Sequence, residues 1–231
     1  MSGKISAILL AAGSGSRMKS DTKKQFMELA GKPVLYYSLR ALEESRVDEI
    51  ILVVSKEDKD YCQCELVEKY GFSKVSNITE GGKQRWESVE HGLLCVTGQY
   101  CLIHDGARPL IRPETINELI DEGENRDGLI LAVPVKDTIK VVGQDGEIVQ
   151  TPNRDTLYAA QTPQMFRTQL LKRAYSLMRE DAAPSICITD DAMLVQYYTG
   201  AKVKVFPGDY VNIKVTTPED MGLAALFIRE K

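Results

Sequence analysis

Histidine is scarce in this chain and its cysteines lack regular spacing: the 231 residues include 2 His and 5 Cys. Zinc sites are built from these residues at characteristic spacings, so we expect no zinc site. Cys62 and Cys64 are too close together for a CxxC pair, and an odd, irregular set of cysteines does not form a disulfide framework. The pattern indicates a reducing compartment, and we expect the cytoplasm.

Long apolar segments and an excess of positive charge are also missing. The apolar run 5–12 is far shorter than the roughly 20 residues that cross a bilayer, and the Gly and Ser residues after it do not form a signal-peptide cleavage site. Lys and Arg number 29 against 33 Asp and Glu, a formal net charge of -4. We therefore expect no membrane partner and no nucleic-acid partner, although net charge does not exclude a local anion site.

Two familiar nucleotide motifs are absent. A P-loop ends in Gly-Lys-Ser/Thr, whereas Pro33 follows the Gly-Lys pair at 31–32. A dinucleotide fingerprint needs a third glycine, whereas Met18 stands at that position after Gly13 and Gly15. The sequence therefore disfavours a P-loop protein and a nucleotide-dependent dehydrogenase.

Short apolar runs alternate with segments of helical period through most of the chain. This rhythm predicts an α/β fold, with a mostly parallel sheet covered by helices on both faces. Ligands of such sheets bind beyond the carboxyl ends of the strands, where the strand order switches. Strands are predicted at 5–12, 49–54, 75–79, 100–104, 129–135 and 203–206, and helices after Pro33, at 56–70, 83–95, 113–124, 168–179 and 189–199, and from Pro218.

The rhythm breaks at Asp137. Two short β-rich runs, 138–142 and 148–151, flank a strong turn signal at 143–146. We predict a single domain over 1–231 with a protruding β-hairpin arm at about 137–158. Because an isolated hairpin is marginal in water, we expect the arm to pack on a second copy of the chain.

Junctions between strands and helices carry the candidate anion-binding residues. The loop Ala11–Gly15 follows the first strand, and its small residues let backbone N–H groups approach an oxyanion. Arg17 and Lys24 follow it, which favours an anion site over an ordinary glycine-rich turn. A second junction, 81–88, starts with two glycines before a helix, but alone an ordinary loop explains it as well.

A third junction follows a predicted central strand. Asp105 there suits a ribose hydroxyl or a metal, and Arg108 suits a phosphate. We interpret His104 as a core histidine with a satisfied ring, and His91 as a structural residue of a helix. Lys214 and a second isolated cation near the arm are by themselves consistent with solvated charges.

These motifs occur together in one order, and in that order the chain resembles the cytidylyltransferases of non-mevalonate isoprenoid synthesis. That family joins cytidine triphosphate (CTP) to 2-C-methyl-D-erythritol 4-phosphate, and the similarity runs over about 4–228. Each run is weak alone, but the set is specific. The runs are Ala11-Ala12-Gly13-x-Gly15-x-Arg17-Met18, Lys24-Gln25, Gly81-Gly82 with Arg85 and Ser88, His104–Pro109, Pro134–Thr138, Gln161–Gln164, Thr189-Asp190-Asp191 and Asn212–Thr216.

The resemblance implies a Rossmann-like fold whose arm crosses into a twofold partner, and a reaction without a nucleophilic side chain. An acceptor phosphate oxygen attacks the α-phosphorus in line, and pyrophosphate leaves. Mg²⁺ is expected mainly on the triphosphate, with no protein ligand named. The implied residues are Ala11, Ala12, Gly13, Ser14, Gly15, Gly81, Gly82, Arg85, Ser88, Asp105, Gly106 and Ala107 for CTP; Arg108, Asp137, Thr138 and Thr162 for the acceptor; and Arg17, Lys24, Arg154 (from the partner's arm) and Lys214 as catalytic cations.

Alternatives remain at this point. Ribitol-5-phosphate and other alditol-phosphate cytidylyltransferases tend to carry Ala-Gly-Gly at the first loop and Ser-Val before Arg-Pro, whereas Ala12-Gly13 and Gly106-Ala107 are typical of the isoprenoid enzymes. A non-catalytic nucleotide-binding scaffold is disfavoured by the four cations. The chain also departs from the family at Val211, where an acidic residue is frequent, so we expect a missing hydrogen bond or an altered charge balance near Lys214, without loss of the activity.

Overall fold

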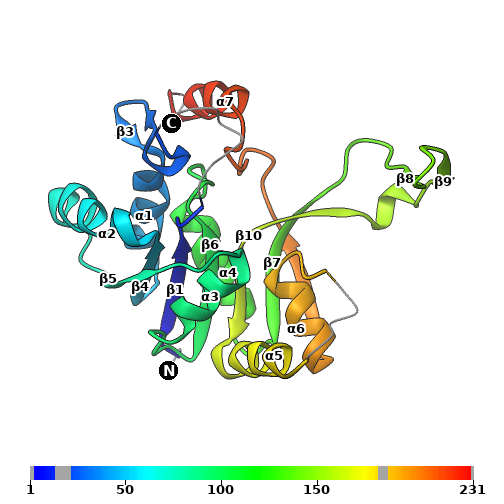
Figure 1. The fold of residues 1–231 in the computed structure, drawn as a ribbon, viewed down its shortest axis with the longest axis horizontal. Helices are drawn as coiled ribbons and strands as arrows, with labels where there is room; N and C mark the ends of the chain where they lie inside the picture. The colour runs from blue at the N-terminus through cyan, green and yellow to red at the C-terminus, as the bar shows by residue number, and fades with distance from the viewer. Residues whose placement is uncertain (1–2, 14–21, 182–186, 230–231) are drawn as a thin grey trace.

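The computed structural model describes residues 3–13, 22–181 and 187–229. These residues form one central sheet with helices on both faces and an arm that extends from one side (Figure 1). The predicted loop residues Ser14, Gly15 and Arg17 lie outside the described residues. Among those described, no helix combines the length and apolarity needed to cross a bilayer.

The central sheet has the strand order β11-β7-β10-β6-β1-β4-β5. Neighbouring strands are parallel except β10, which runs antiparallel to both β6 and β7. The predicted mostly parallel sheet is therefore confirmed. Its strands are β1 (Ile5–Leu10), β4 (Glu49–Val54), β5 (Val75–Glu80), β6 (Tyr100–Asp105), β7 (Gly128–Pro134), β10 (Tyr158–Arg167) and β11 (Val203–Pro207).

Buried side chains on the two sheet faces form separate cores. Ala7 and Leu9 of β1 face a core with α1 and α4, whereas Ile8 faces a core with α3, α5 and α6. This alternation along one strand is what a sheet covered on both faces requires. The helices are α1 (Val34–Glu44), α3 (Arg85–Leu93), α4 (Pro113–Gly123), α5 (Thr168–Glu180), α6 (Asp191–Thr199) and α7 (Pro218–Arg229).

The segment predicted as one helix at 56–70 is instead composite. It consists of a 3-10 turn (η3, Lys56–Asp58), a short α-helical turn (α2, Lys59–Tyr61) and a π-helical stretch (η4, Cys62–Glu68). Cys62, Leu66 and Val67 face the core. Such spacing suits an α-helix and a π-helix alike, so the apolar pattern could not distinguish them.

Strand β10 was not predicted, and its composition explains why. Its middle holds Gln161, Pro163 and Gln164, and a proline within a run argues against a central strand. The register with β7 shifts between Ala160 and Gln164, which accommodates this interruption. The two glutamines are buried and hydrogen-bonded, so polar residues occupy positions where the pattern calls for apolar ones.

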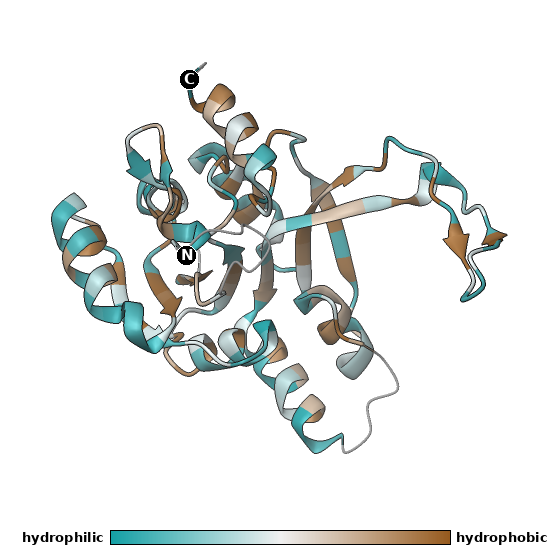
Figure 2. Cartoon of the chain, turned by 45° about the horizontal axis from the view of Figure 1, so that its top comes forward, coloured by the Kyte–Doolittle hydropathy of each residue, from teal (hydrophilic) through white to brown (hydrophobic). Residues whose placement is uncertain are grey.

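The predicted hairpin is present. Strands β8 (Val141–Val142) and β9 (Ile148–Gln150) pair antiparallel at the tip of the arm, followed by the turn η5 (Arg154–Thr156). Figure 2 shows apolar residues in both short strands, away from the body of the molecule. Ile148 and Val149 are 62% and 70% exposed, which leaves an apolar surface uncovered in a single chain. A second, smaller hairpin joins β2 (Glu28–Leu29) and β3 (Lys32–Pro33).

The strand order reverses next to β1. The chain passes from β1 to β4 and β5 on one side, then returns to β6 on the other side. Leu10 at the end of β1 is in register with Asp105 at the end of β6. The carboxyl ends of these two strands therefore form the switch point at which α/β sheets bind ligands.

Candidate active site

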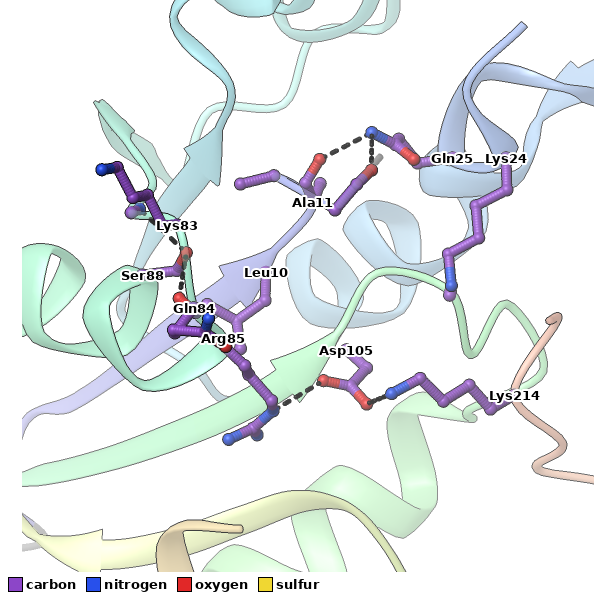
Figure 3. A pocket seen from close by; sticks show the side chains of 14 residues that line it. Leu10, Ala11, Lys24, Gln25, Lys83, Gln84, Arg85, Ser88, Asp105 and Lys214 are labelled. Carbon is purple, nitrogen blue, oxygen red and sulfur yellow. Dashed lines mark hydrogen bonds and ion pairs between the residues drawn. The ribbon is translucent and has the colours of Figure 1, made fainter. Parts of the chain in front are cut away.

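A cavity of about 400 Å³ lies at this switch point (Figure 3). Its walls come from the segments that follow β1, β5 and β6, together with η2 (Lys24–Phe26) and the segment before α7. The structure thus brings together junctions that are far apart in the sequence. The lining residues are Leu10, Ala11, Ala12, Gly13, Lys24, Gln25, Gly82, Lys83, Gln84, Arg85, Ser88, Asp105, Ala107 and Lys214.

Two of the predicted nucleotide-site glycines pack behind this lining. A Cβ atom on Gly81 would lie 2.4 Å from the Ala12 Cβ and 2.8 Å from the Ser88 Oγ. One on Gly106 would lie 2.7 Å from Leu35 Cδ1. Both positions therefore need glycine for the segments to approach one another. Direct contact of these glycines with a nucleotide stays a prediction.

Asp105 is the centre of an ion-pair network in the cavity. Its Oδ2 lies 2.7 Å from the Lys214 Nζ, and its Oδ1 lies 3.5 Å from the Arg85 Nε. Burial alone would raise the pKa of Asp105, but the charges of Arg85 and Lys214 outweigh burial and hold the pKa well below its usual range. The carboxyl is therefore ionised, and it balances part of the positive charge in the cavity.

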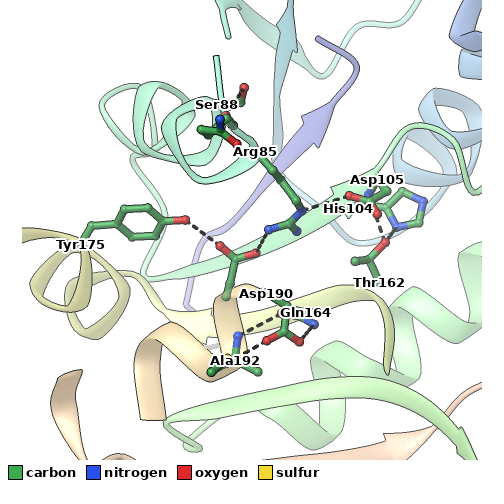
Figure 4. Close-up of polar contacts among 12 residues, drawn as sticks. Arg85, Ser88, His104, Asp105, Thr162, Gln164, Tyr175, Asp190 and Ala192 are labelled. Carbon is green, nitrogen blue, oxygen red and sulfur yellow. Dashed lines mark hydrogen bonds and ion pairs between the residues drawn. The ribbon is translucent and has the colours of Figure 1, made fainter. Parts of the chain in front are cut away.

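Arg85 continues the network away from the cavity (Figure 4). Its Nη1 lies 2.7 Å from the Asp191 Oδ2, and the Tyr175 hydroxyl donates to the Asp191 Oδ1 at 2.7 Å. Burial would lower the pKa of Arg85, but Asp191 and Asp105 outweigh it and raise the pKa. The guanidinium is thus held between two carboxylates on different elements.

The Asp191 carboxylate is placed by the start of α6. Asp190 caps this helix by accepting a hydrogen bond from the Met193 N–H at 2.9 Å, and Asp191 is its first residue. Carboxylates are favoured at a helix N-terminus. Sequence reasoning had noted the acidic pair without giving it a role, although two acids before an apolar helical run are a recognisable helix-start signal.

His104 is fully buried behind Asp105. Its Nε2 faces the Arg108 carbonyl at 3.4 Å, so Nε2 carries the hydrogen and Nδ1 accepts from the Thr162 hydroxyl at 3.1 Å. The Thr162 Oγ1 in turn accepts from the Asp105 N–H at 3.0 Å. Burial lowers the pKa of His104 to about 4. The interpretation of His104 as a satisfied core residue is confirmed.

We expect this buried imidazole to make the protein less stable in mild acid. The ordinary pKa of 6.5 applies to His104 in the unfolded chain, whereas the folded value is about 4. Between these values the unfolded chain holds the extra proton, so the free energy of unfolding falls as pH decreases, by up to about 3 kcal/mol. Urea denaturation between about pH 6.5 and 5, above the range of carboxylates, measures the slope.

His104→Gln should flatten this slope, and His91→Gln is the matched control. His91 is half-buried on α3, where its Nδ1 contacts the Glu80 carbonyl at 2.8 Å. An unchanged slope in the His104 variant contradicts the assignment.

The predicted acceptor residues fall into two groups. Arg108 and Thr162 lie beside the cavity but have internal partners: the Arg108 Nη1 donates to the Asn212 carbonyl at 2.7 Å. Asp137 and Thr138 lie on the exposed arm, as does Arg154, whose Nη1 donates to the Lys136 carbonyl at 3.1 Å. These three arm residues do not line the cavity of their own chain.

Position 211 does not disturb the balance of charge at Lys214. The Val211 N–H donates to the Asp209 Oδ1 at 2.9 Å, and its side chain packs with the apolar cluster under α7. Lys214 is balanced by Asp105. Sequence reasoning could not find this partner, because the two residues lie on different segments.

Metal binding by the protein alone has little basis among the described residues. They contain no group of three His, Cys, Asp or Glu side chains that could hold a metal ion. Asp105 is the one acidic residue among the lining residues given above. A hard divalent ion in this cavity would therefore take most of its oxygen ligands from a bound anion.

Comparison with known proteins agrees with these features. The family model described as 2-C-methyl-D-erythritol 4-phosphate cytidylyltransferase (IspD) matches residues 5–230. Two relatives with that name are similar along their whole length. The one from Lachnospira eligens is 48% identical over 96% of this chain and 98% of its own, and the one from Lachnoclostridium phytofermentans is 46% identical over 98% and 97%.

Solved structures show the same fold. The 4-diphosphocytidyl-2C-methyl-D-erythritol synthase of Anaerococcus prevotii superposes with a TM-score of 0.85 at 33% identity, covering 99% of this chain and 100% of that one. The cytidylyltransferase of Thermus thermophilus gives a TM-score of 0.78 at 25% identity, covering 96% and 98%. The cavity at the switch point, the family match and these similarities together show that the chain belongs to the 2-C-methyl-D-erythritol 4-phosphate cytidylyltransferase family.

Proposed function

We propose that this protein transfers the cytidylyl group of CTP to 2-C-methyl-D-erythritol 4-phosphate and releases pyrophosphate. One observation carries the proposal: Lys24, Arg85 and Lys214 line a cavity at the carboxyl ends of β1 and β6, beside small residues that permit close approach of a phosphate. The names of the relatives support the choice of CTP and of the acceptor. The alditol-phosphate alternative has no comparable support.

The chain's task in this reaction is to hold two anions together and to neutralise charge. The acceptor phosphate oxygen attacks the α-phosphorus, the bond to the bridging oxygen breaks, and pyrophosphate carries away the electron pair. Lys24 and Lys214 can approach the phosphates, and Asp105 keeps Lys214 in place through the 2.7 Å ion pair. Well-placed cations of this kind each contribute on the order of 3 kcal/mol to transition-state stabilisation.

Mg²⁺ fits this arrangement as a partner of the nucleotide. The ion would neutralise phosphate charge when bound with CTP. Asp105 is the lining residue whose carboxylate could reach it, and the remaining oxygen ligands would come from the triphosphate and water. Magnesium dependence of turnover tests this part of the proposal.

We place the acceptor beside Arg108, which adjoins the lining residue Ala107. Among the described residues, four buried side-chain atoms have no hydrogen-bond partner, and two of them, the Arg108 Nε and the Asn212 Oδ1, belong to residues that contact each other. A buried donor and a buried acceptor without partners are costly unless a ligand or water meets them. A hydroxyl group can donate and accept, which makes a polyol a chemically suitable partner for this pair of atoms.

Pyrophosphate release is the direct test. The wild-type protein with CTP, 2-C-methyl-D-erythritol 4-phosphate and Mg²⁺ should release pyrophosphate, and omission of any one should abolish it. Ribitol 5-phosphate in a parallel assay separates the alternative acceptor. CTP binding without turnover on either acceptor would favour the scaffold interpretation and contradict the proposal.

We also propose a homodimer in the cytoplasm, with the arm of each chain reaching the other chain's cavity. The exposed apolar residues of the arm, Val142, Ile148 and Val149, support a covered position in an assembly. The five cysteines form no disulfide, which suits a reducing compartment. Arg154 on the exposed arm would then complete the partner's site.

Mixed dimers test the crossing of the arm. Arg154→Ala and Lys24→Met should each be nearly inactive as homodimers. Mixed in equal amounts, the two variants should recover about a quarter of wild-type activity, because one site of each hybrid has an intact cavity and an intact arm. Activity is measured after co-refolding, with each variant alone as control. Absence of recovery, with hybrids verified by a tag, contradicts the crossing.

A further inference from the structure

Lys23, Lys24 and Gln25 are consecutive, yet their side chains reach three different parts of the molecule. Gln25 contacts the loop after β1, Lys23 contacts the segment after β4, and Lys24 extends into the cavity (Figure 3). Lys24 provides the charge neutralisation described above. Lys23 does not line the cavity, and Gln25, which does, uses its amide to donate to backbone carbonyls.

Gln25 acts on the loop backbone. Its side-chain Nε2 donates to the Ala11 carbonyl at 2.8 Å and to the Gly13 carbonyl at 3.2 Å, and the residue is 2% exposed. The Ala11 N–H is itself fixed by the Val53 carbonyl at 2.7 Å. In Figure 3 Gln25 and Ala11 lie near the top of the view, and Asp105 and Lys214 lie lower.

The direction of the Ala11 and Gly13 carbonyls determines whether this part of the loop repels a bound anion. Carbonyl oxygens carry partial negative charge and repel phosphate, whereas backbone N–H groups attract it. Because the buried Gln25 amide donates to both carbonyl oxygens, these oxygens point toward Gln25. The bond to Gly13 also joins two parts of the chain that are twelve residues apart, which restricts Gly13 before any ligand binds.

Lys23 anchors the 3-10 turn η2, which carries Lys24 and Gln25, to the segment after β4. Its ammonium lies 2.8 Å from the Ser55 Oγ and 2.7 Å from both the Glu57 Oε1 and the Asp58 Oδ2. Three acceptors use the three protons that a lysine can donate. Lys23 is therefore engaged with the protein, while Lys24, in the following 3-10 turn, faces the cavity.

We propose that Gln25 and Lys23 are positioning residues of the nucleotide site. Gln25 orients the loop carbonyls so that the loop accepts the triphosphate, and Lys23 fixes the turn that directs Lys24 at it. The inference rests on the proposed function for the identity of the anion. It assigns two residues that act through others and do not touch the reacting atoms.

Gln25→Met tests the first part, because it keeps the length of the side chain and removes both donors. We expect the dissociation constant of CTP, titrated without acceptor, to rise about tenfold. The KM of the acceptor should stay within about twofold, since we place the acceptor beside Arg108 and not at this loop. Gln169→Met, an exposed glutamine on α5, is the matched control and should change neither constant.

The outcomes distinguish positioning from folding. Thermal melting shows whether Gln25→Met is folded, and Gln25→Asn, one methylene shorter, is the second variant if it is not. An unchanged CTP affinity in a folded variant, or equal losses for both substrates, overturns the assignment. A wild-type protein that binds CTP but releases no pyrophosphate refutes the proposed function instead, and the CTP titration still decides the role of Gln25.

Lys23→Met tests the second part. We expect kcat to fall about tenfold, because the turn that carries Lys24 loses its anchor. In a Lys24→Met background the same change should have no further effect on kcat, since Lys23 acts through Lys24. An additional loss as large as in the wild type overturns the positioning role of Lys23.

Discussion

Replacing Lys24 by methionine should lower kcat about a hundredfold, while the dissociation constant of CTP rises no more than about threefold. Methionine keeps the length of the side chain and removes its charge. Lys24 lines the cavity and in Figure 3 extends toward the side where Asp105 and Lys214 lie. A cation at this position stabilises the transition state more than the bound substrates, because negative charge then accumulates between the α-phosphorus and the leaving group.

Single-turnover and CTP-titration experiments separate the two quantities. Lys69→Met is the matched control, because Lys69 pairs with Glu65 on the exposed surface of a helical segment away from the cavity. The control should retain wild-type kcat. If Lys24→Met weakens CTP binding as much as it slows turnover, Lys24 contributes to ground-state binding and not to the transition state.

Strands β1, β4, β6 and β7 were predictable because their burial leaves little choice of residue. Glu49–Val54 is buried at every position, and the apolar run gave both ends of β4. The arm was predictable for the opposite reason: the turn at 143–146 requires special residues, and Gly146 has a φ of 85°. Local rules determine both features.

The site was only partly predictable, because its chemistry depends on pairs that are far apart in the sequence. Arg85 and Asp191 are 106 residues apart, and no periodic pattern links them. Gln25 looked like part of a motif, and its two carbonyl partners appeared only in the fold. The resemblance named most of the lining residues but not Leu10, Lys83 or Gln84, and the contacts between them required the three-dimensional structure.

Replacing Asp191 by alanine should cost about 3 kcal/mol of the free energy of unfolding. The change leaves the Arg85 guanidinium with only the longer 3.5 Å contact to Asp105, and it leaves the Tyr175 hydroxyl without its acceptor. Breaking a buried ion pair usually costs about 3–5 kcal/mol. The lower end applies because the Arg85 side chain is 31% exposed and water can solvate it.

Urea denaturation of the apoprotein measures this cost, with Asp121→Ala as the matched control. Asp121 pairs with Arg46 where both side chains are at least half exposed, so its loss should cost less than about 1 kcal/mol. Similar values for the two variants would show that the Asp191 pair is no stronger than a surface pair.

The double variant Arg85→Met/Asp191→Ala gives the sharper result. Methionine at position 85 removes the positive charge that Asp191 compensates. In that background the loss of Asp191 no longer leaves a guanidinium without its carboxylate partner. We expect Asp191→Ala to cost at least about 1.5 kcal/mol less there than in the wild type. Additive costs would mean that Asp191 stabilises the protein through α6 and Tyr175 alone. Arg85 would then be held at the cavity by Asp105, and CTP affinity should be unchanged in the Asp191 variant.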